Sequence, residues 1–165
     1  VNQASRTVVL AVDESLRGLP AGRELSPIEK QYAERLVRQR VHQPAFRATI
    51  MLAYDRRCAV CVLKHVELLD AAHIIEDGND WGEPVVTNGL SLCKIHHAVY
   101  DRKFLGISPD YKVHINRELL EEVDGPMLKH GLQEMQGRAL HVPNHRGERP
   151  DRQRLDERFQ SFLGA

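Results

Sequence analysis

Three cysteines and one histidine stand in two short pairs that constrain the fold of this chain more than any other feature of its sequence. Cys58 and Cys61 enclose two residues, and 32 residues after Cys61 the pair Cys93 and His96 begins with the same spacing. Three thiolates and one imidazole are a ligand set that tetrahedral Zn²⁺ prefers, and four protein ligands leave no position open to a substrate. The spacing therefore predicts one structural zinc ion held by Cys58, Cys61, Cys93 and His96.

Two other interpretations of these residues stay open. The cysteines could be buried free thiols beside an unrelated histidine. Cys58 and Cys61 could also form a redox pair, which would leave Cys93 and His96 unexplained. Thiolates held by a metal fit a reducing compartment and a chain without disulfides. We therefore expect a cytoplasmic protein.

Length and composition indicate one folded domain with appendages. The chain has 165 residues, of which 42% are hydrophobic and 28% charged, and these values argue against a disordered chain and against a fibrous rod. No apolar run approaches the roughly 20 residues of a membrane helix, so we expect no membrane partner. The chain starts at Val1 rather than Met. We expect a fragment of a longer protein, in which residues 1–25 are an N-terminal extension or a linker from an upstream specificity domain.

The charge is balanced over the whole chain but uneven along it. The 23 basic and 23 acidic residues cancel, which weighs against a strongly basic nucleic-acid binder, although local fields matter more than totals. Between residues 35 and 57, six arginines accompany a single acidic residue, and arginine binds phosphate in a bidentate fork. A solvated helix face is the alternative. We predict phosphate contacts for Arg40, Arg47, Arg56 and Arg57.

Capping and turn residues predict helices towards both ends of the chain and a mixed centre. Ser26 and Pro27 suit the first positions of a helix, and Pro44 starts a second helix that runs through Tyr54. Apolar spacing and turn residues predict the other elements. These are an extended segment over Val66–Ile75, a loop over Glu76–Gly82, a helix from Leu90 to Phe104, a hairpin over Leu105–Asn116, a helix over Pro126–Gln136, a connector over Val142–Arg152 and a terminal helix that ends near Leu163.

His97 follows the predicted zinc ligand His96 directly and should face elsewhere, because successive residues of a helix point about 100° apart. Asp101 lies four residues further on, and residues at this spacing share one face of a helix. The pair could hold a second cation through one nitrogen and one oxygen, with its other positions open to water. A weak polar pair on a surface helix is the alternative.

The order of these residues resembles that of the HNH nucleases, the ββα-metal class, in the zinc-knuckle subgroup common among bacterial restriction endonucleases. The resemblance covers about residues 42–116, including a similar helical lead-in. It rests on Cys58-Ala-Val-Cys61, Leu69-Asp-Ala-Ala-His73-Ile and Thr87-Asn88-Gly-Leu-Ser-Leu-Cys93-Lys-Ile-His96-His97-Ala-Val-Tyr-Asp101. The intervals of 15 residues from His73 to Asn88, 9 from Asn88 to His97 and 4 from His97 to Asp101 are similar to those of the colicin-type DNases.

The resemblance implies an α+β fold with a ββα-metal HNH core and a structural zinc knuckle, flanked by N-terminal and C-terminal helices. It implies that His73 is the general base, a task that suits imidazole because its pKa lies near neutrality. On its own, His73 would be better explained as a core histidine. By the same resemblance, Asn88 braces the loop and holds the His73 ring, and His97 with Asp101 binds a divalent cation at the scissile phosphate.

One position departs from the family pattern. Many members carry a metal-binding Asp or His directly before the base, where this chain has Ala72. The cation would then be held by His97, Asp101 and waters, or Asp70 would reach it from three residues before the base. Asp70 points away from His73 in a regular strand, so the second option would need a bulge, and we favour Asp101. Mg²⁺, Mn²⁺ and Ni²⁺ all stay open as the catalytic ion.

The predicted function is metal-dependent hydrolysis of phosphodiester bonds in double-stranded DNA, of the restriction or phage-defence type. The alternative is a non-catalytic, zinc-stabilised module that binds nucleic acid, and a structural protein with a zinc staple is a third interpretation. One HNH centre cuts one strand, so a double-strand break would suggest a homodimer. The predicted domains are 1–25 as extension or linker, 26–57 as helical lead-in, 58–116 as HNH core and 117–165 as C-terminal helical extension.

Overall fold

The computed structural model describes residues 26–27 and 42–165 of the chain. The chain divides into two units, residues 1–45 and 46–165, and the architecture below is that of the second, which begins within a helix that is described over residues 42–53. The predicted extension 1–25, the predicted helix after Pro27 and Arg40 lie outside the described residues. Within residues 42–165, no helix is long and apolar enough to cross a membrane.

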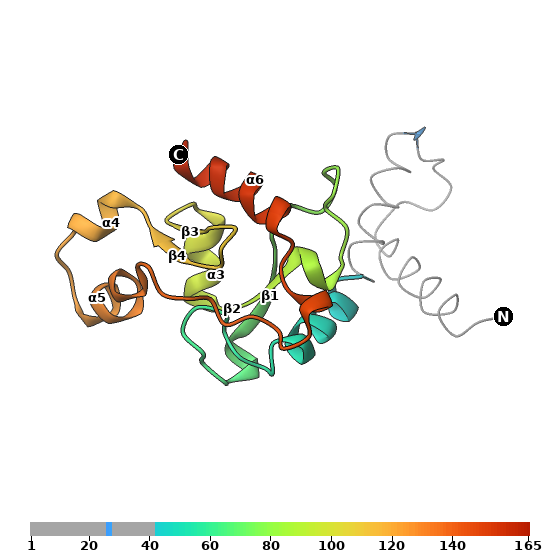
Figure 1. The fold of residues 1–165 in the computed structure, drawn as a ribbon, viewed down its shortest axis with the longest axis horizontal. Coiled ribbons are helices and arrows are strands. Elements are labelled where there is room, and N and C mark those ends of the chain that lie inside the picture. Colours follow the sequence, from blue (N-terminus) through green and yellow to red (C-terminus); the bar gives the residue numbers. More distant parts are fainter. Residues whose placement is uncertain (1–25, 28–41) are drawn as a thin grey trace. The chain divides into compact units, whose positions relative to one another are not determined.

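The centre of the second unit is an antiparallel hairpin followed directly by a helix (Figure 1). Strand β1 (Leu69–His73) pairs with strand β2 (Gly89–Cys93) in a regular register that places His73 opposite Gly89. Helix α3 (Lys94–Asp101) begins at the residue after β2 and packs against both strands. The predicted α+β class with a ββα core is therefore confirmed.

The prediction of a single helix from Leu90 to Phe104 is wrong at both ends. Residues 90–93 belong to β2, and the helix covers only Lys94–Asp101. All five residues of β2 are buried, and a strand that is covered on both faces lacks the alternation of polar and apolar residues that marks a half-exposed strand. The apolar spacing in this segment was therefore ambiguous between strand and helix.

The helix before the hairpin covers residues 42–53, so it already includes two residues ahead of Pro44, where we predicted its start. Its buried side chains Phe46 and Ile50 pack against the beginning of β2. A Cβ atom at Gly89 would lie 2.8 Å from Phe46 Cζ and even closer to the Ile50 side chain. Tyr54 Oη donates a hydrogen bond of 3.0 Å to the Gly89 carbonyl. The helix can approach the strand this closely only because residue 89 has no side chain.

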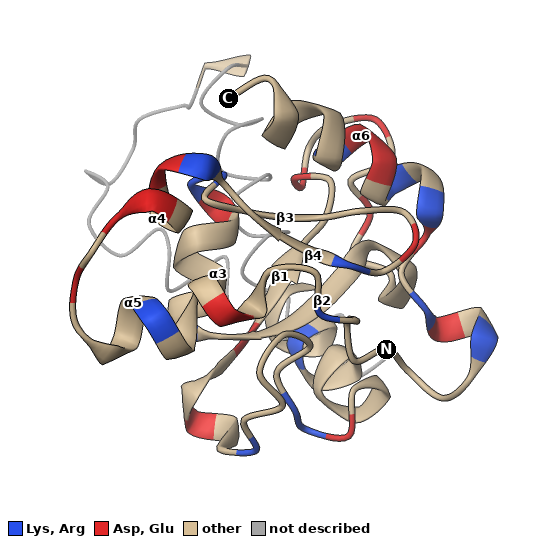
Figure 2. Cartoon of the chain, turned by 60° about the vertical axis from the view of Figure 1, so that its left-hand side comes forward, with Lys and Arg blue, Asp and Glu red and all other residues tan. Residues whose placement is uncertain are grey.

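A second hairpin follows α3, as predicted. It consists of β3 (Leu105–Ile107) and β4 (Val113–Ile115), which pair antiparallel. Next come α4 (Arg117–Glu121) and α5 (Pro126–Gly131), and Figure 2 shows acidic residues on α4. The predicted helix Pro126–Gln136 is interrupted, because α5 ends at Gly131 and a separate 3-10 turn covers Gln133–Met135.

The predicted terminal helix is confirmed as α6 (Arg152–Leu163). Its N-cap is Asp151, whose side chain accepts hydrogen bonds from the amides of Gln153 and Arg154, and an Asp in this position satisfies amides that have no partner within the helix. Figure 1 shows α6 beside β3. The C-terminal helix is therefore a neighbour of the ββα core and of the second hairpin.

We expect Gly89→Ala to lower the free energy of unfolding by about 1–3 kcal/mol, because the added methyl group must displace Ile50 and Phe46 from a packed contact. Urea unfolding followed by circular dichroism would measure the change. Gly147→Ala is the matched control, since a Cβ atom at Gly147 meets nothing within 4 Å. Equal stabilities of the two variants would contradict the close approach of the helix to β2.

Candidate metal centre and active site

Four side chains converge into a cluster that could hold one metal ion. One ligand atom from each of Cys58, Cys61, Cys93 and His96 lies within 4.8 Å of the others. The Cys61 and Cys93 sulfurs are 4.0 Å apart, and His96 Nδ1 lies 3.1 Å from the Cys93 sulfur and 3.5 Å from the Cys58 sulfur. Tetrahedral bonds of about 2.3 Å place two sulfurs about 3.8 Å apart. The Cys3His set expected from the sequence is therefore assembled at separations that suit a four-coordinate ion.

The local backbone explains why these side chains converge. The first pair lies in a tight turn after the helix 42–53, where the Val62 amide donates to the Cys58 carbonyl and Val62 has a φ of 57°. The second pair spans the junction between β2 and α3, so the change from strand to helix sets its spacing. The two pairs are joined by a hydrogen bond of 3.3 Å from the Cys93 amide to the Cys58 sulfur.

The imidazole of His96 is oriented by a group that the sequence analysis missed. His96 Nε2 lies 2.9 Å from the carbonyl oxygen of Gly131, the last residue of α5. An imidazole that donates from Nε2 presents the lone pair of Nδ1 to the cluster, which is the usual outer support of a metal-binding histidine. No sequence signal could identify Gly131, because a backbone carbonyl carries no side-chain pattern.

The pKa values of two thiols in the cluster are shifted in opposite directions. Hydrogen bonds with Cys58 and Cys93 raise the pKa of Cys61, whereas hydrogen bonds with Cys58 and Cys61 lower the pKa of Cys93. Burial disfavours the charged form of His96, but hydrogen bonds with the sulfurs of Cys58 and Cys93 outweigh burial and raise its pKa to about 10. The cluster thus favours the thiolate at Cys93, the form in which cysteine binds metals, and the neutral thiol at Cys61.

His73 is the last residue of β1, and its ring lies against an aromatic ring from the preceding helix. The ring centroids of His73 and Phe46 are 4.2 Å apart, with 21° between the planes. His73 Nε2 is buried and has no hydrogen-bond partner among the described residues. Burial lowers the pKa of His73, the Asp77 carboxylate opposes this effect, and His97 adds to it. A neutral imidazole can act as a base through the ring nitrogen that carries no hydrogen.

Asn88 closes the loop that follows His73. Its side chain is fully buried. Oδ1 accepts from the Ile75 amide at 2.9 Å, and Nδ2 donates to the carbonyls of Ile75 and Glu83 at 3.0 Å each. The Asn88 carbonyl accepts from the Ile74 amide at 2.9 Å. The two ends of the loop 74–88 are therefore held together directly beside His73.

His97 lies between two carboxylates, outside the cluster that contains His96. Its Nδ1 is 3.5 Å from Asp70 Oδ2, and its Nε2 is 3.4 Å from Asp101 Oδ2. The expectation that Asp70 needs a bulge to come near this position is wrong, since the register of β1 is regular. Asp70 lies on the side of the hairpin against which α3 packs, and so it reaches His97 from a regular strand.

Lys94 also binds Asp70, a contact that the sequence did not reveal. Its Nζ lies 2.7 Å from each oxygen of the Asp70 carboxylate. Burial alone would raise the pKa of Asp70, but the hydrogen bonds from Lys94 and His97 outweigh it and lower the pKa. Because Lys94 already holds this carboxylate, Asp101 is the more accessible acid beside His97.

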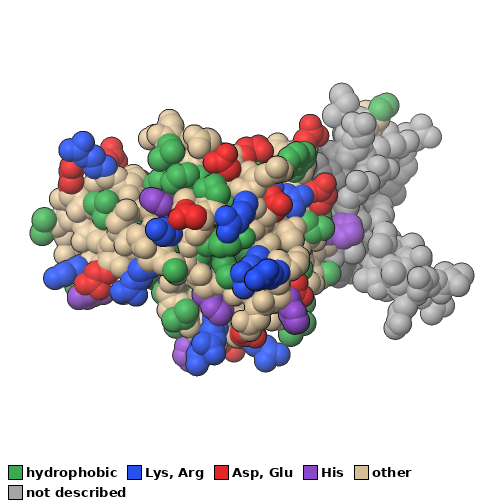
Figure 3. All heavy atoms as spheres, viewed as in Figure 1, with side chains coloured by type: hydrophobic (Ala, Val, Ile, Leu, Met, Phe, Trp, Pro, Cys, Tyr) green, Lys and Arg blue, Asp and Glu red, His purple; other side chains and the backbone are tan. Residues whose placement is uncertain are grey.

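The arginines predicted to contact phosphate lie in different environments. The guanidinium of Arg47 donates to the carbonyls of Val66 and Leu69 at 2.8 and 2.9 Å, so it ties the lead-in helix to the start of β1. Arg56 is exposed, and Arg57 is partly buried with an unpaired Nε. On the face shown in Figure 3, basic and acidic side chains are interspersed.

One family model matches the segment that contains the Cys3His cluster and the candidate active-site histidines. Residues 58–108 match the family model described as HNH endonuclease, whereas no curated protein matches the chain. Among solved structures, the chain is similar to one titled "Modification dependent TagI restriction endonuclease", with 21% identity and a TM-score of 0.47. That similarity covers 69% of this chain but only 36% of the other, so the chain spans about a third of its length. The family model confirms the resemblance to the HNH endonucleases for residues 58–108, the segment that contains the ββα core.

Proposed function

We propose that the protein is a metal-dependent endonuclease that hydrolyses phosphodiester bonds in double-stranded DNA, of the restriction or phage-defence type. The observation that carries the proposal is that two neighbouring histidines on α3 face different groups of residues. His96 belongs to the Cys3His cluster, while His97 faces Asp70 and Asp101. A module that only binds nucleic acid needs the first group of residues but has no use for the second.

His73 acts as the general base. The attacking water gives its proton to the imidazole of His73 as its oxygen bonds to phosphorus, and the bond from phosphorus to the 3′ oxygen breaks. Stacking on Phe46 limits rotation of the ring, and Asn88 fixes the loop that follows it. A base held in one orientation loses little entropy on reaching the transition state.

His97 and Asp101 are the residues that would hold the catalytic cation, with Asp70 as a third candidate. When bound, a divalent ion supplies positive charge that stabilises the phosphorane-like transition state and the leaving oxygen. One nitrogen and one or two carboxylate oxygens with remaining water positions suit Mg²⁺, Mn²⁺ or Ni²⁺. The Cys3His cluster would hold Zn²⁺ as a structural ion, because four protein ligands leave no position for substrate.

We expect His73→Ala to reduce nicking of supercoiled plasmid by at least about 100-fold, which is the usual contribution of a general base. Gel assays with Mg²⁺, Mn²⁺ and Ni²⁺ would measure the rate. His145→Ala, which removes an exposed histidine, is the control and should cleave like the wild type. If wild type and His73→Ala leave the plasmid equally intact with all three metals, the binding module becomes the better interpretation.

The acid side of the pH profile should report His73. Only the neutral imidazole accepts a proton, and burial holds the pKa of His73 below its ordinary value of 6.5, so kcat/KM should rise with pH with a midpoint below pH 6.5. Because the Asp77 carboxylate raises this pKa, Asp77→Asn should move the acid limb to lower pH. Asp124→Asn serves as the charge-matched control. A limb that moves upward in Asp77→Asn would contradict the assignment.

The two neighbouring histidines should differ in their effect on zinc. We expect the wild type to contain one zinc ion per chain by elemental mass spectrometry. His96→Ala should lose the ion, and His97→Ala should retain it while losing cleavage. Complete removal by a chelator should unfold the central region, since the free energy of metal binding is also folding free energy. A zinc-free protein with an unchanged melting temperature would refute the structural assignment.

A further inference from the structure

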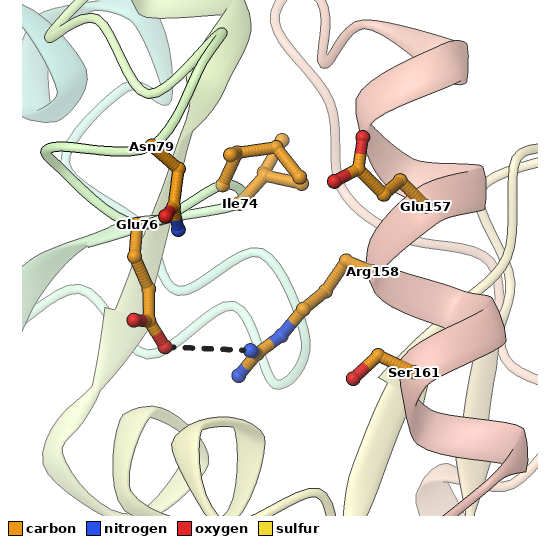
Figure 4. A pocket seen from close by; sticks show the side chains of 7 residues that line it. Ile74, Glu76, Asn79, Glu157, Arg158 and Ser161 are labelled. Carbon is orange, nitrogen blue, oxygen red and sulfur yellow. Dashed lines mark ion pairs between the residues drawn. The ribbon is translucent and has the colours of Figure 1, made fainter.

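A hollow separates α6 from the loop that carries the candidate active site. This pocket of about 220 Å³ is lined by Ile74, Ile75, Glu76, Asn79, Glu157, Arg158 and Ser161. Figure 4 shows the side chains of the loop on one side and those of α6 on the other, with an ion pair across the space. Polar links join the loop and the helix around this pocket.

The first link is Arg158, which joins α6 to two parts of the ββα core. Its Nη2 donates a hydrogen bond of 3.1 Å to the Tyr100 carbonyl, and its guanidinium lies 5.0 Å from the centre of the Tyr100 ring. Its Nη1 lies 3.8 Å from Glu76 Oε1. Tyr100 precedes Asp101 on α3, and Glu76 lies three residues after His73. Arg158 therefore bridges the helix of the candidate cation site and the loop of the candidate base.

The second link is Arg154, which binds the other end of the loop. Its Nη1 donates to Thr87 Oγ1 at 3.1 Å, and its Nη2 lies 2.7 Å from Glu83 Oε2. The backbone adds a hydrogen bond of 2.8 Å from the Asp151 amide to the Thr87 carbonyl. Thr87 precedes Asn88, and the Glu83 carbonyl accepts from the Asn88 side chain. Arg154 thus supports the clamp that Asn88 forms.

Helix α6 is itself fixed in place. Leu155 is fully buried, and Phe162 packs so closely on β3 that a Cβ atom at Gly106 would lie 2.6 Å from its Cγ. Both arginines are mostly covered, with 14% and 15% of the side chains of Arg154 and Arg158 exposed. A planar guanidinium held by several partners is a rigid connection, whereas a lysine ammonium is a compact charge on a flexible stem and lacks the planar fork.

We propose that Arg154 and Arg158 are positioning residues for the HNH site. They hold the loop 74–88, with His73 and Asn88 at its ends, in register with α3, which carries His97 and Asp101. This proposal rests on the proposed function for its catalytic consequence. Neither arginine reaches a reacting group. Each acts through the residues that it binds, so a chain that lacks these links should keep its fold and its zinc but lose the alignment of its site.

Hydrogen exchange measures this positioning without reference to activity. The amides of Ile74 and Ile75 donate to Asn88, so in Arg154→Gln and Arg158→Gln they should exchange about tenfold faster or more. The Ala59 amide, which donates to the Ser91 carbonyl near the cysteine cluster, should be unchanged. Arg152→Gln is the matched control, because Arg152 lies on the same helix but contacts Tyr111 instead.

Cleavage kinetics test the consequence for the reaction. Arg158→Gln should lower kcat by about 10- to 100-fold, since small misplacements of reacting groups have effects of this size, while KM for plasmid changes by less than about threefold. Arg158→Lys should recover only a minor part of the kcat that Arg158→Gln loses, because lysine keeps the positive charge but not the planar guanidinium. Glu76→Gln and Thr87→Val break the same links from the loop side, so the test does not depend on the folding of the α6 variants.

Two results would overturn the proposal. One is unchanged hydrogen exchange at the Ile74 and Ile75 amides in the variants Arg154→Gln, Arg158→Gln, Glu76→Gln and Thr87→Val. The other is an intact kcat combined with weaker DNA binding and a smaller salt dependence, which would identify the arginines as phosphate contacts. A third combination is possible. If the variants exchange faster but the wild type cuts no DNA with any of the three metals, the positioning role is supported and the proposed function is rejected.

Discussion

The convergence of Cys58, Cys61, Cys93 and His96 is the constraint on which the rest of the ββα core depends. These residues join the turn after the lead-in helix to the junction between β2 and α3. Both the hairpin and the helix that form the candidate active site start or end at this cluster. Its geometry therefore sets where β2 stops, where α3 begins and in which direction α3 leaves the hairpin.

The step from strand to helix also separates two adjacent imidazoles. His96 points into the cluster and is held from outside by the Gly131 carbonyl, whereas His97 points to Asp70 and Asp101. A rotation of about 100° per residue makes this divergence unavoidable in a helix. One short segment thus presents one imidazole to the Cys3His cluster and the next to two carboxylates, since the same backbone fixes the angle between them.

His73 and the loop 74–88 are held in place by residues that are distant in sequence. Phe46 stacks on His73 from the lead-in helix, and Arg154 and Arg158 reach the loop 74–88 from the last helix. Only the absence of a side chain at Gly89 lets the lead-in helix lie so close to β2. The ββα core is therefore supported by two helices that the segment 58–108 itself does not contain.

The sequence by itself determined the cysteine and histidine cluster, the second hairpin and the terminal helix, because each rests on local spacing or on turn and capping residues. It indicated the ββα class only through the resemblance to the HNH nucleases. Only the tertiary structure decided that β2 includes Leu90 to Cys93, that Asp70 meets His97 from a regular strand and that Arg47 binds backbone carbonyls rather than standing free. It also revealed Gly131 and the two arginines of α6. The physical reason is that a strand buried on both faces, a carbonyl acceptor and an ion pair between distant segments leave no periodic pattern along the chain.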